Sequence, residues 1–183
     1  MGSGGAFMGR MREAGTGVTE RSADTTSRSF EEFFRDEHAR LLRALFLVTG
    51  NEDEAEELMQ EAFLKVWERW ERVGRLEDPT GYLYRTAMNA FRSRYRRAVL
   101  AARRVVGLGP GRDAFAAADE RDLVARALAT LTPRQRAALV LTELLGYGSE
   151  EAGRLLGVKG VTARVLASQA RAALRVELER TDE

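Results

Sequence analysis

The apolar residues of this chain recur every three or four positions, which is the spacing of helices with one buried face. The first such stripe begins after Ser29, which forms a capping-box pattern with Glu32, and it ends before Gly50. Its apolar members are Phe30, Phe33, Phe34, Leu41, Leu42, Leu45 and Phe46. Nowhere do apolar and polar residues alternate as they do in a strand. The pattern therefore predicts an all-α fold.

Two further helices follow in the first half of the chain. Asn51 caps the second helix, whose first turn is acidic, as the helix dipole favours. Its apolar stripe consists of Ala55, Leu58, Met59, Ala62, Phe63, Val66, Trp67 and Trp70. Asp78-Pro79 begins the third helix, with Asp as the cap and Pro at the first position. We therefore expect a helical domain over residues 29–101, preceded by a disordered tail over residues 1–28.

Glycines and a proline then interrupt the helical spacing and indicate a linker over residues 102–118. Helical spacing returns in a second domain over residues 119–183. Near its end, a short helix capped by Ser149 is followed by a turn at Gly157 and a longer helix over about Val161–Leu178. This is the spacing of a helix-turn-helix. The chain is thus predicted to hold two small helical domains joined by a flexible linker, the second ending in a helix-turn-helix.

The charges of the chain are segregated, although 29 basic and 28 acidic residues nearly cancel. The segment Glu31–Asp78 has a net charge of −7, whereas Pro79–Arg112 has no acid and a net charge of +8. The arginines of this second segment are Arg85, Arg92, Arg94, Arg96, Arg97, Arg103, Arg104 and Arg112. A solvated helix face is the alternative, but such a face normally mixes both signs to gain ion pairs. The acid-free segment therefore favours a phosphate-binding surface.

Aromatic residues lie among these arginines, and a second basic face is expected on the last helix. The aromatic residues are Tyr82, Tyr84, Phe91 and Tyr95. Rings that stack on bases, beside guanidinium groups that hold phosphates, suit a single nucleic-acid strand. On the last helix, helical spacing places Arg164, Ser168, Arg171 and Arg175 on one face. A neighbouring stripe of Ala163, Ala167, Ala170 and Leu174 is expected to pack inward.

The composition argues against an enzyme. The chain has no cysteine and one histidine, and it contains no nucleophile elbow and no phosphate-binding loop. We therefore expect no catalytic residues, no metal site and no cofactor. The acidic second helix is more consistent with a solvated face, or with a face that docks on a basic protein, than with a cation site. No apolar run is long enough to cross a bilayer, and together with the absence of cysteine this favours a cytoplasmic location.

Three motifs in order resemble a known family. Residues 55–67 are similar to the second conserved region of bacterial RNA polymerase sigma factors of the extracytoplasmic-function (ECF) group. Residues 82–89, followed by Arg96-Arg97, are similar to the adjoining promoter-melting region. Residues 128–136 and the helix-turn-helix are similar to the fourth region. The resemblance covers about residues 29–178, so it includes nearly all of the chain that is expected to be ordered.

The resemblance implies a function and its residues. Such a protein binds core RNA polymerase, recognises promoter DNA at the −10 and −35 elements and opens the upstream part of the bubble, and an anti-sigma factor is a further partner to consider. The residues placed on or behind the polymerase-binding helix are Leu58, Gln60, Glu61 and Phe63. The DNA-binding residues are Tyr82, Arg85, Asn89, Arg92, Arg96 and Arg97 in the first domain and Thr162, Arg164, Ser168 and Arg171 in the second. Fully extended, the linker would span on the order of 60 Å, or about 17 base pairs.

The last helix departs from the family pattern, and other interpretations stay open. Val165 and Leu166 stand where the family has polar residues, so either the helix is rotated or its −35 contact is weak. One rival is a helix-turn-helix regulator that binds duplex DNA as a dimer without polymerase. Another is a helical adaptor whose arginines meet an acidic protein. The aromatic and basic third helix favours the sigma factor.

Overall fold

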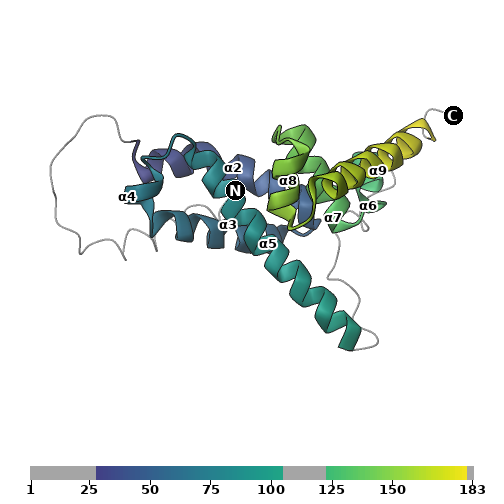
Figure 1. Ribbon diagram of the computed structural model, residues 1–183, viewed down its shortest axis with the longest axis horizontal. Helices are drawn as coiled ribbons and strands as arrows, with labels where there is room; N and C mark the ends of the chain where they lie inside the picture. Colours follow the sequence, from purple (N-terminus) through teal and green to yellow (C-terminus); the bar gives the residue numbers. More distant parts are fainter. Residues whose placement is uncertain (1–27, 105–122, 181–183) are drawn as a thin grey trace.

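The computed structural model describes residues 28–104 and 123–180, and within these ranges every regular element is a helix (Figure 1). The first domain contains α2 (Phe30–Thr49), α3 (Glu52–Trp67), the short α4 (Trp70–Val73) and α5 (Pro79–Arg104). The second contains α6 (Leu123–Ala129), α7 (Pro133–Leu139), the π-helix η2 (Val140–Leu144), α8 (Ser149–Leu156) and α9 (Gly160–Glu179). The all-α fold is confirmed. Nearly all of the expected tail, and residues 105–118 of the expected linker, lie outside the described residues.

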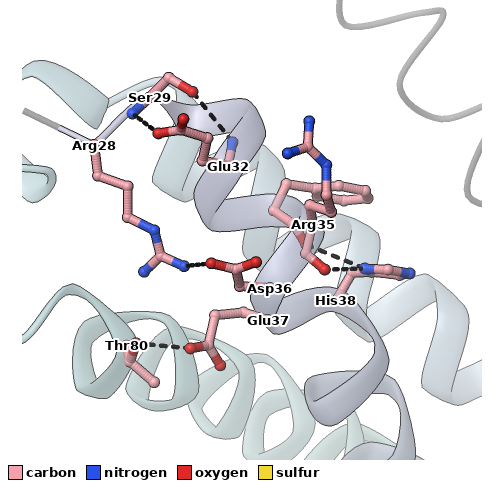
Figure 2. Close-up of polar contacts among 9 residues, drawn as sticks. Arg28, Ser29, Glu32, Arg35, Asp36, Glu37, His38 and Thr80 are labelled. Carbon is pink, nitrogen blue, oxygen red and sulfur yellow. Dashed lines mark hydrogen bonds and ion pairs between the residues drawn. The ribbon is translucent and has the colours of Figure 1, made fainter.

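The start signals at Ser29 and Asn51 form as expected. The Ser29 hydroxyl accepts a hydrogen bond from the Glu32 backbone N–H at 3.2 Å, and the Glu32 carboxylate accepts one from the Ser29 N–H at 3.1 Å (Figure 2). The Asn51 side chain likewise accepts from the Glu54 N–H at 2.8 Å and caps α3. Gly50 ends α2 with a φ of 69°, a left-handed conformation that glycine adopts at little cost. The predicted cap at Ser149 was wrong, because Ser149 is the first residue of α8 and Gly148, which has no side chain to accept a hydrogen bond, holds the cap position.

The prediction for the C-terminal end of α3 was wrong. We placed Trp70 on this helix, but α3 ends at Trp67 and Trp70 begins the separate helix α4. The Arg69 backbone between them is non-helical, with φ −122° and ψ 16°. The break lets the Trp70 ring pack against the first turn of α2, with centroids 5.4 Å from Phe30 and 5.0 Å from Phe33. Aromatic packing across helices thus overrides the local periodicity.

The two domains share one continuous apolar core. In the first domain α2, α3 and α5 pack together, and in the second α9 packs against α6, α7 and α8. Helix α2 also contacts α7 and η2, while α5 contacts α8, and Leu141 of η2 belongs to the same buried cluster as the first domain's aromatics. At the end of α2, Phe46 and Leu47 pack against the smaller cluster formed by α6 and α9. The domains therefore lie side by side, which the linker alone did not predict.

A buried polar contact joins α2 to α5. The Glu37 carboxylate accepts a hydrogen bond from the Thr80 hydroxyl at 3.1 Å (Figure 2). The Tyr84 side chain, on the next turn of α5, is only 2% exposed. Burial, with a smaller effect from Glu37, raises the pKa of the Tyr84 phenol to about 12.

We expect this phenol to make the fold sensitive to alkaline pH. Below pH 10, its ordinary pKa, Tyr84 is neutral in both the folded and the unfolded chain, so its contribution to stability is complete. Between pH 10 and 12 only the unfolded chain ionises, and about 2–3 kcal/mol of stability is lost as the pH rises. Urea unfolding of the wild type and of Tyr84→Phe at pH 8 and pH 11 measures this, and the variant should lose less stability. An equal loss in both proteins would contradict the assignment.

Candidate nucleic-acid interface and polymerase-docking surface

A row of polar residues follows the outer side of α5. Tyr82, Arg85, Asn89, Arg92 and Arg96 are spaced by three or four positions, so they lie along one side of the helix. The side chains of Arg85, Asn89 and Arg96 are exposed, and those of Tyr82 and Arg92 are half-buried. The C-terminal part of α5 extends away from the body of the protein (Figure 1). The structure therefore brings these predicted residues together on an accessible surface, which we call the α5 row.

Arg97 lies beside this row, and its side chain is exposed. Its Nε donates a hydrogen bond to the Ser93 carbonyl oxygen at 3.4 Å, one turn earlier on the same helix. No acid occurs anywhere in α5. The exposed guanidinium groups of Arg96 and Arg97 are therefore positioned for an anionic partner.

The aromatic residues of α5 divide into two groups, which corrects the sequence interpretation. Tyr84 and Phe91 are buried in the core, so they cannot stack on bases. Both lie on the apolar side of an amphipathic helix, and their rings fill that core. Tyr82 and Tyr95 are half-buried and keep part of each ring accessible. The Tyr82 hydroxyl accepts a hydrogen bond from Arg69 Nη1 at 3.2 Å, which lowers the pKa of the Tyr82 phenol.

Arg94 points to the opposite side of α5 from the row. Its guanidinium lies 2.5 Å from the Glu57 carboxylate and 3.6 Å from the Glu61 carboxylate, both on α3. The acidic and basic segments of the sequence therefore neutralise each other in part, inside the first domain. Among the described arginines of α5, those of the row lie on the side away from Arg94, whereas Arg97 lines a hollow with Arg94 and Glu61 of α3. The phosphate-binding surface is therefore smaller than the charge count implied.

The predicted polymerase-binding residues of α3 also divide into two groups. Leu58 and Phe63 are fully buried, so they support the outer side of α3 from the core and are not accessible to a partner. Gln60 and Glu61 are half-buried on the outer side. Leu64, which the sequence analysis did not select, is 42% exposed beside them. The signal for Leu64 was present, because it is an apolar residue outside the apolar stripe of its helix.

The Glu61 carboxylate is held in its charged form. It accepts a hydrogen bond from Lys65 Nζ at 2.7 Å, one turn along the same helix. This bond is the main cause of the lowered pKa of Glu61, and the positive charges of Lys65 and Arg94 add to it. A basic partner would therefore meet an ionised carboxylate here at neutral pH.

Helices α8 and α9 form the predicted helix-turn-helix. Gly157 ends α8 with a φ of 67°. A Cβ on Gly153 would lie 2.8 Å from the Gly160 backbone nitrogen, so the close approach of the two helices needs glycine. The inward stripe of α9 is confirmed for Ala163 and Ala167, which are buried, as is Ala170.

The predicted DNA-binding residues of α9 lie outward. Thr162, Arg164 and Ser168 are exposed. Arg171 is exposed as well, but its Nη1 donates to a Glu143 carboxylate oxygen at 2.6 Å. Exposed pairs of this kind contribute little to stability, so a phosphate can replace Glu143 as the partner of Arg171.

The second domain contacts the α5 row directly. Arg85 lies 3.8 Å from the Glu151 carboxylate of α8. The Arg92 side chain packs on the turn of the helix-turn-helix, where a Cβ on Gly157 would be 2.7 Å from Arg92 Nη1. The row is therefore partly covered in this arrangement. Just beyond it, the guanidinium of Arg134 lies 5.3 Å from the centroid of the Tyr95 ring.

Two features are absent from the described residues, 28–104 and 123–180. No group of three or more His, Asp or Glu side chains within them could hold a metal ion. None of the helices in these ranges is both long enough and apolar enough to cross a membrane.

A basic row in one helical domain and a helix-turn-helix in the other are typical of DNA-binding proteins. Comparison with known proteins identifies the family. The protein family described as sigma-70 region 2 matches residues 33–100, and the family described as sigma-70 region 4 matches residues 121–174. The chain belongs to the ECF group of RNA polymerase sigma factors. The resemblance drawn from the sequence is confirmed, and because sigma factors are DNA-recognition regulators, the non-enzymatic function is confirmed with it.

Individual relatives agree with this family. The chain is 32% identical over 176 residues to the ECF RNA polymerase sigma factor SigE of Mycolicibacterium smegmatis, covering 88% of this chain and 66% of that relative. It thus spans just under two thirds of that relative's length. It is 30% identical over 154 residues to the ECF sigma factor SigL of Mycobacterium tuberculosis, covering 79% of this chain and 86% of the relative.

A solved structure shares the fold. The sigma factor RpoE of Bartonella quintana, crystallised with the anti-sigma factor NepR, matches with a TM-score of 0.62 at 21% identity. The match covers 82% of this chain and 96% of that one. At this identity the likeness concerns the fold alone.

Proposed function

We propose that the two domains divide promoter recognition between them. The first domain, residues 29–101, docks on core RNA polymerase and holds the nontemplate strand of the −10 element. The second domain, residues 119–183, reads the −35 element, and the linker, residues 102–118, connects the two sites. The observation that carries this proposal is the pair of basic helices, one in each domain: α5 has no acid, and α9 has none before Glu177.

Docking on core polymerase is assigned to the outer side of α3. The charged Glu61, the half-buried Gln60 and the exposed Leu64 form a small mixed surface. A half-apolar, half-acidic surface of this kind suits a basic protein partner better than DNA, because its carboxylate would repel phosphates. Leu58 and Phe63 hold this helix in place from the core.

Capture of the −10 strand is assigned to the α5 row and Arg97. Arg96 and Arg97 are exposed and form no ion pair with the described part of the second domain, and they supply phosphate contacts. Tyr82 offers a partly exposed ring for base stacking, and Asn89 offers an amide for hydrogen bonds. Arg85 and Arg92 join them once the second domain moves away.

The −35 element is assigned to α9. Thr162, Arg164 and Ser168 face solvent over its first turns and are free to meet base edges and phosphates. Arg171 would exchange its bond with Glu143 for a phosphate.

A cytoplasmic location follows from this proposed function, because the chain must meet RNA polymerase and the chromosome. An anti-sigma factor is a further proposed partner. The solved relative from Bartonella quintana was crystallised with such a protein, which supports testing for one here.

We expect the isolated chain to bind promoter duplex weakly and with little sequence preference. Together with core polymerase it should bind the same duplex tightly and with sequence specificity. Two features argue for this. The first turn of α3 carries Glu52 and Asp53, which repel phosphates, and the second domain covers Arg85 and Arg92 of the α5 row. Filter binding of one promoter fragment to the chain alone, to core polymerase alone and to both together measures the difference.

The same experiment distinguishes the proposed function from the rival interpretation. Tight, sequence-specific binding by the isolated chain as a dimer would contradict the proposal and favour a helix-turn-helix regulator. Binding that appears only with core polymerase, and that weakens steeply with salt, is the expected result.

A further inference from the structure

The first turns of α9 expose two valines, and the second of them, Val165, stands where the family pattern has a polar residue. Val161 is 62% exposed and Val165 is 47% exposed. They lie four residues apart, so they adjoin on one side of the helix. The helix is not rotated to hide them, because Ala163 and Ala167 occupy the buried side as its spacing requires. Of the two divergent apolar residues, Val165 therefore faces solvent, whereas Leu166 is half-buried and packs against the core.

The surroundings of the two valines are those of a nucleic-acid surface. Between Lys159 and Val176 the chain has no acidic residue, and the Glu150 carboxylate of α8 lies beside Gly160 at the very start of α9. Lys159, Arg164 and Arg175 are exposed along this stretch. A protein-docking patch usually has an apolar centre of aromatic residues, which this surface lacks. Charge complementarity thus favours a polyanion as the occupant of this face.

The position of the valines indicates which groups of the DNA they would contact. They lie in the first two turns of the second helix of a helix-turn-helix, which is the part that meets base edges in the major groove. The apolar group that the major groove offers to such a side chain is the C5-methyl group of thymine. Two short branched side chains on one side of the helix are suited to contact such methyl groups.

We propose that Val161 and Val165 are specificity-determining residues that read thymine methyl groups in the −35 element. This inference rests on the proposed function of α9. At Val165 the polar contact that the family pattern would place is replaced by an apolar contact, so this chain selects a thymine where a relative with a polar residue would select another base.

The same helix offers a matched control. Val176 is 57% exposed, but it lies near the other end of α9, beside Glu177 and Glu179. Phosphates would avoid this end of the helix. Val176→Ser therefore tests the loss of an exposed valine on the same helix away from the DNA.

The experiment removes single methyl groups from the DNA. The holoenzyme first selects promoters from a random-sequence pool, and each −35 thymine of a selected promoter is then replaced by uracil, which lacks only the methyl group. Each methyl read by a valine should be worth about fourfold in affinity. The double variant Val161→Ser and Val165→Ser should bind thymine and uracil promoters equally, whereas Val176→Ser should discriminate like the wild type.

The outcomes separate this inference from the proposed function. If the wild-type holoenzyme binds its promoters tightly but uracil changes nothing, or if the double variant stays as sensitive as the wild type, the inference is overturned and the proposed function stands. If Arg164→Ala also leaves promoter binding unchanged, α9 does not meet the −35 element, and the proposed function of the second domain fails with the inference. Circular dichroism confirms that each variant folds.

Discussion

Replacing Gln60 with alanine and Glu61 with arginine should weaken assembly with core RNA polymerase by roughly tenfold or more. The double change removes a polar contact and reverses a charge on the proposed docking surface of α3. Opposing like charges in an interface cost several kcal/mol, and central interface residues often contribute about 2 kcal/mol or more each. Fluorescence titration of labelled core polymerase with each variant measures the dissociation constant.

A matched control is needed because Glu61 also bonds Lys65. Lys65→Ala removes this ion pair but leaves Gln60 and Glu61 in place. It should bind core polymerase nearly as the wild type does, since an exposed pair contributes at most about 1 kcal/mol to stability. If the Gln60 and Glu61 variant binds like Lys65→Ala, this part of α3 is not the docking surface.

Replacing Arg96 and Arg97 with alanine should weaken promoter binding by the holoenzyme and flatten its dependence on salt. Each lost phosphate contact lowers the slope of log affinity against log salt by about 0.9 on duplex DNA or about 0.7 on a single strand. The pair should therefore lower the slope by roughly 1.4 to 1.8. Filter binding at several salt concentrations measures it, and an unchanged slope would mean that neither arginine touches phosphate.

Tyr82→Ala should act on strand opening instead. Loss of one base–ring stack costs about 1–3 kcal/mol, so bubble formation should fall while closed-complex binding changes little. Tyr82→Phe is the matched control, because it keeps the ring and removes only the hydroxyl that bonds Arg69. Permanganate reactivity of −10 thymines measures opening on natural and pre-melted templates.

The expected pattern has three parts. Tyr82→Phe opens the promoter, Tyr82→Ala does not, and a pre-melted template restores Tyr82→Ala. Normal opening by Tyr82→Ala, or failure of the pre-melted template to restore it, would contradict the role of α5 in strand capture. Circular dichroism controls for unfolding, since Tyr82 is half-buried.

The features that the sequence predicted correctly are local ones. Helix starts at Ser29 and Asn51 depend on contacts within four residues, and both caps form. The helix-turn-helix depends on the turn at Gly157 and on small residues spaced along α9, which are equally visible in the sequence. The family and the all-α fold followed from these signals.

The features that the sequence did not predict depend on contacts between distant segments. Arg94 belongs to the same basic run as Arg96, yet it pairs with acids on α3. Tyr84 alternates with Tyr82 and looked equivalent, but the packing of α5 against α2 buries it. Neither the arginine block nor the linker indicated that Glu151 would lie near Arg85.

Run-off transcription tests the central claim most directly. Core RNA polymerase is incubated with fragments of the source genome, with and without this chain, and the transcripts are mapped. A sigma factor should yield discrete start sites that require the chain, share −10 and −35 elements and decline with the Gln60 and Glu61 variant. Transcripts identical to those of core polymerase alone, from a chain that still binds duplex DNA by itself, would contradict the claim.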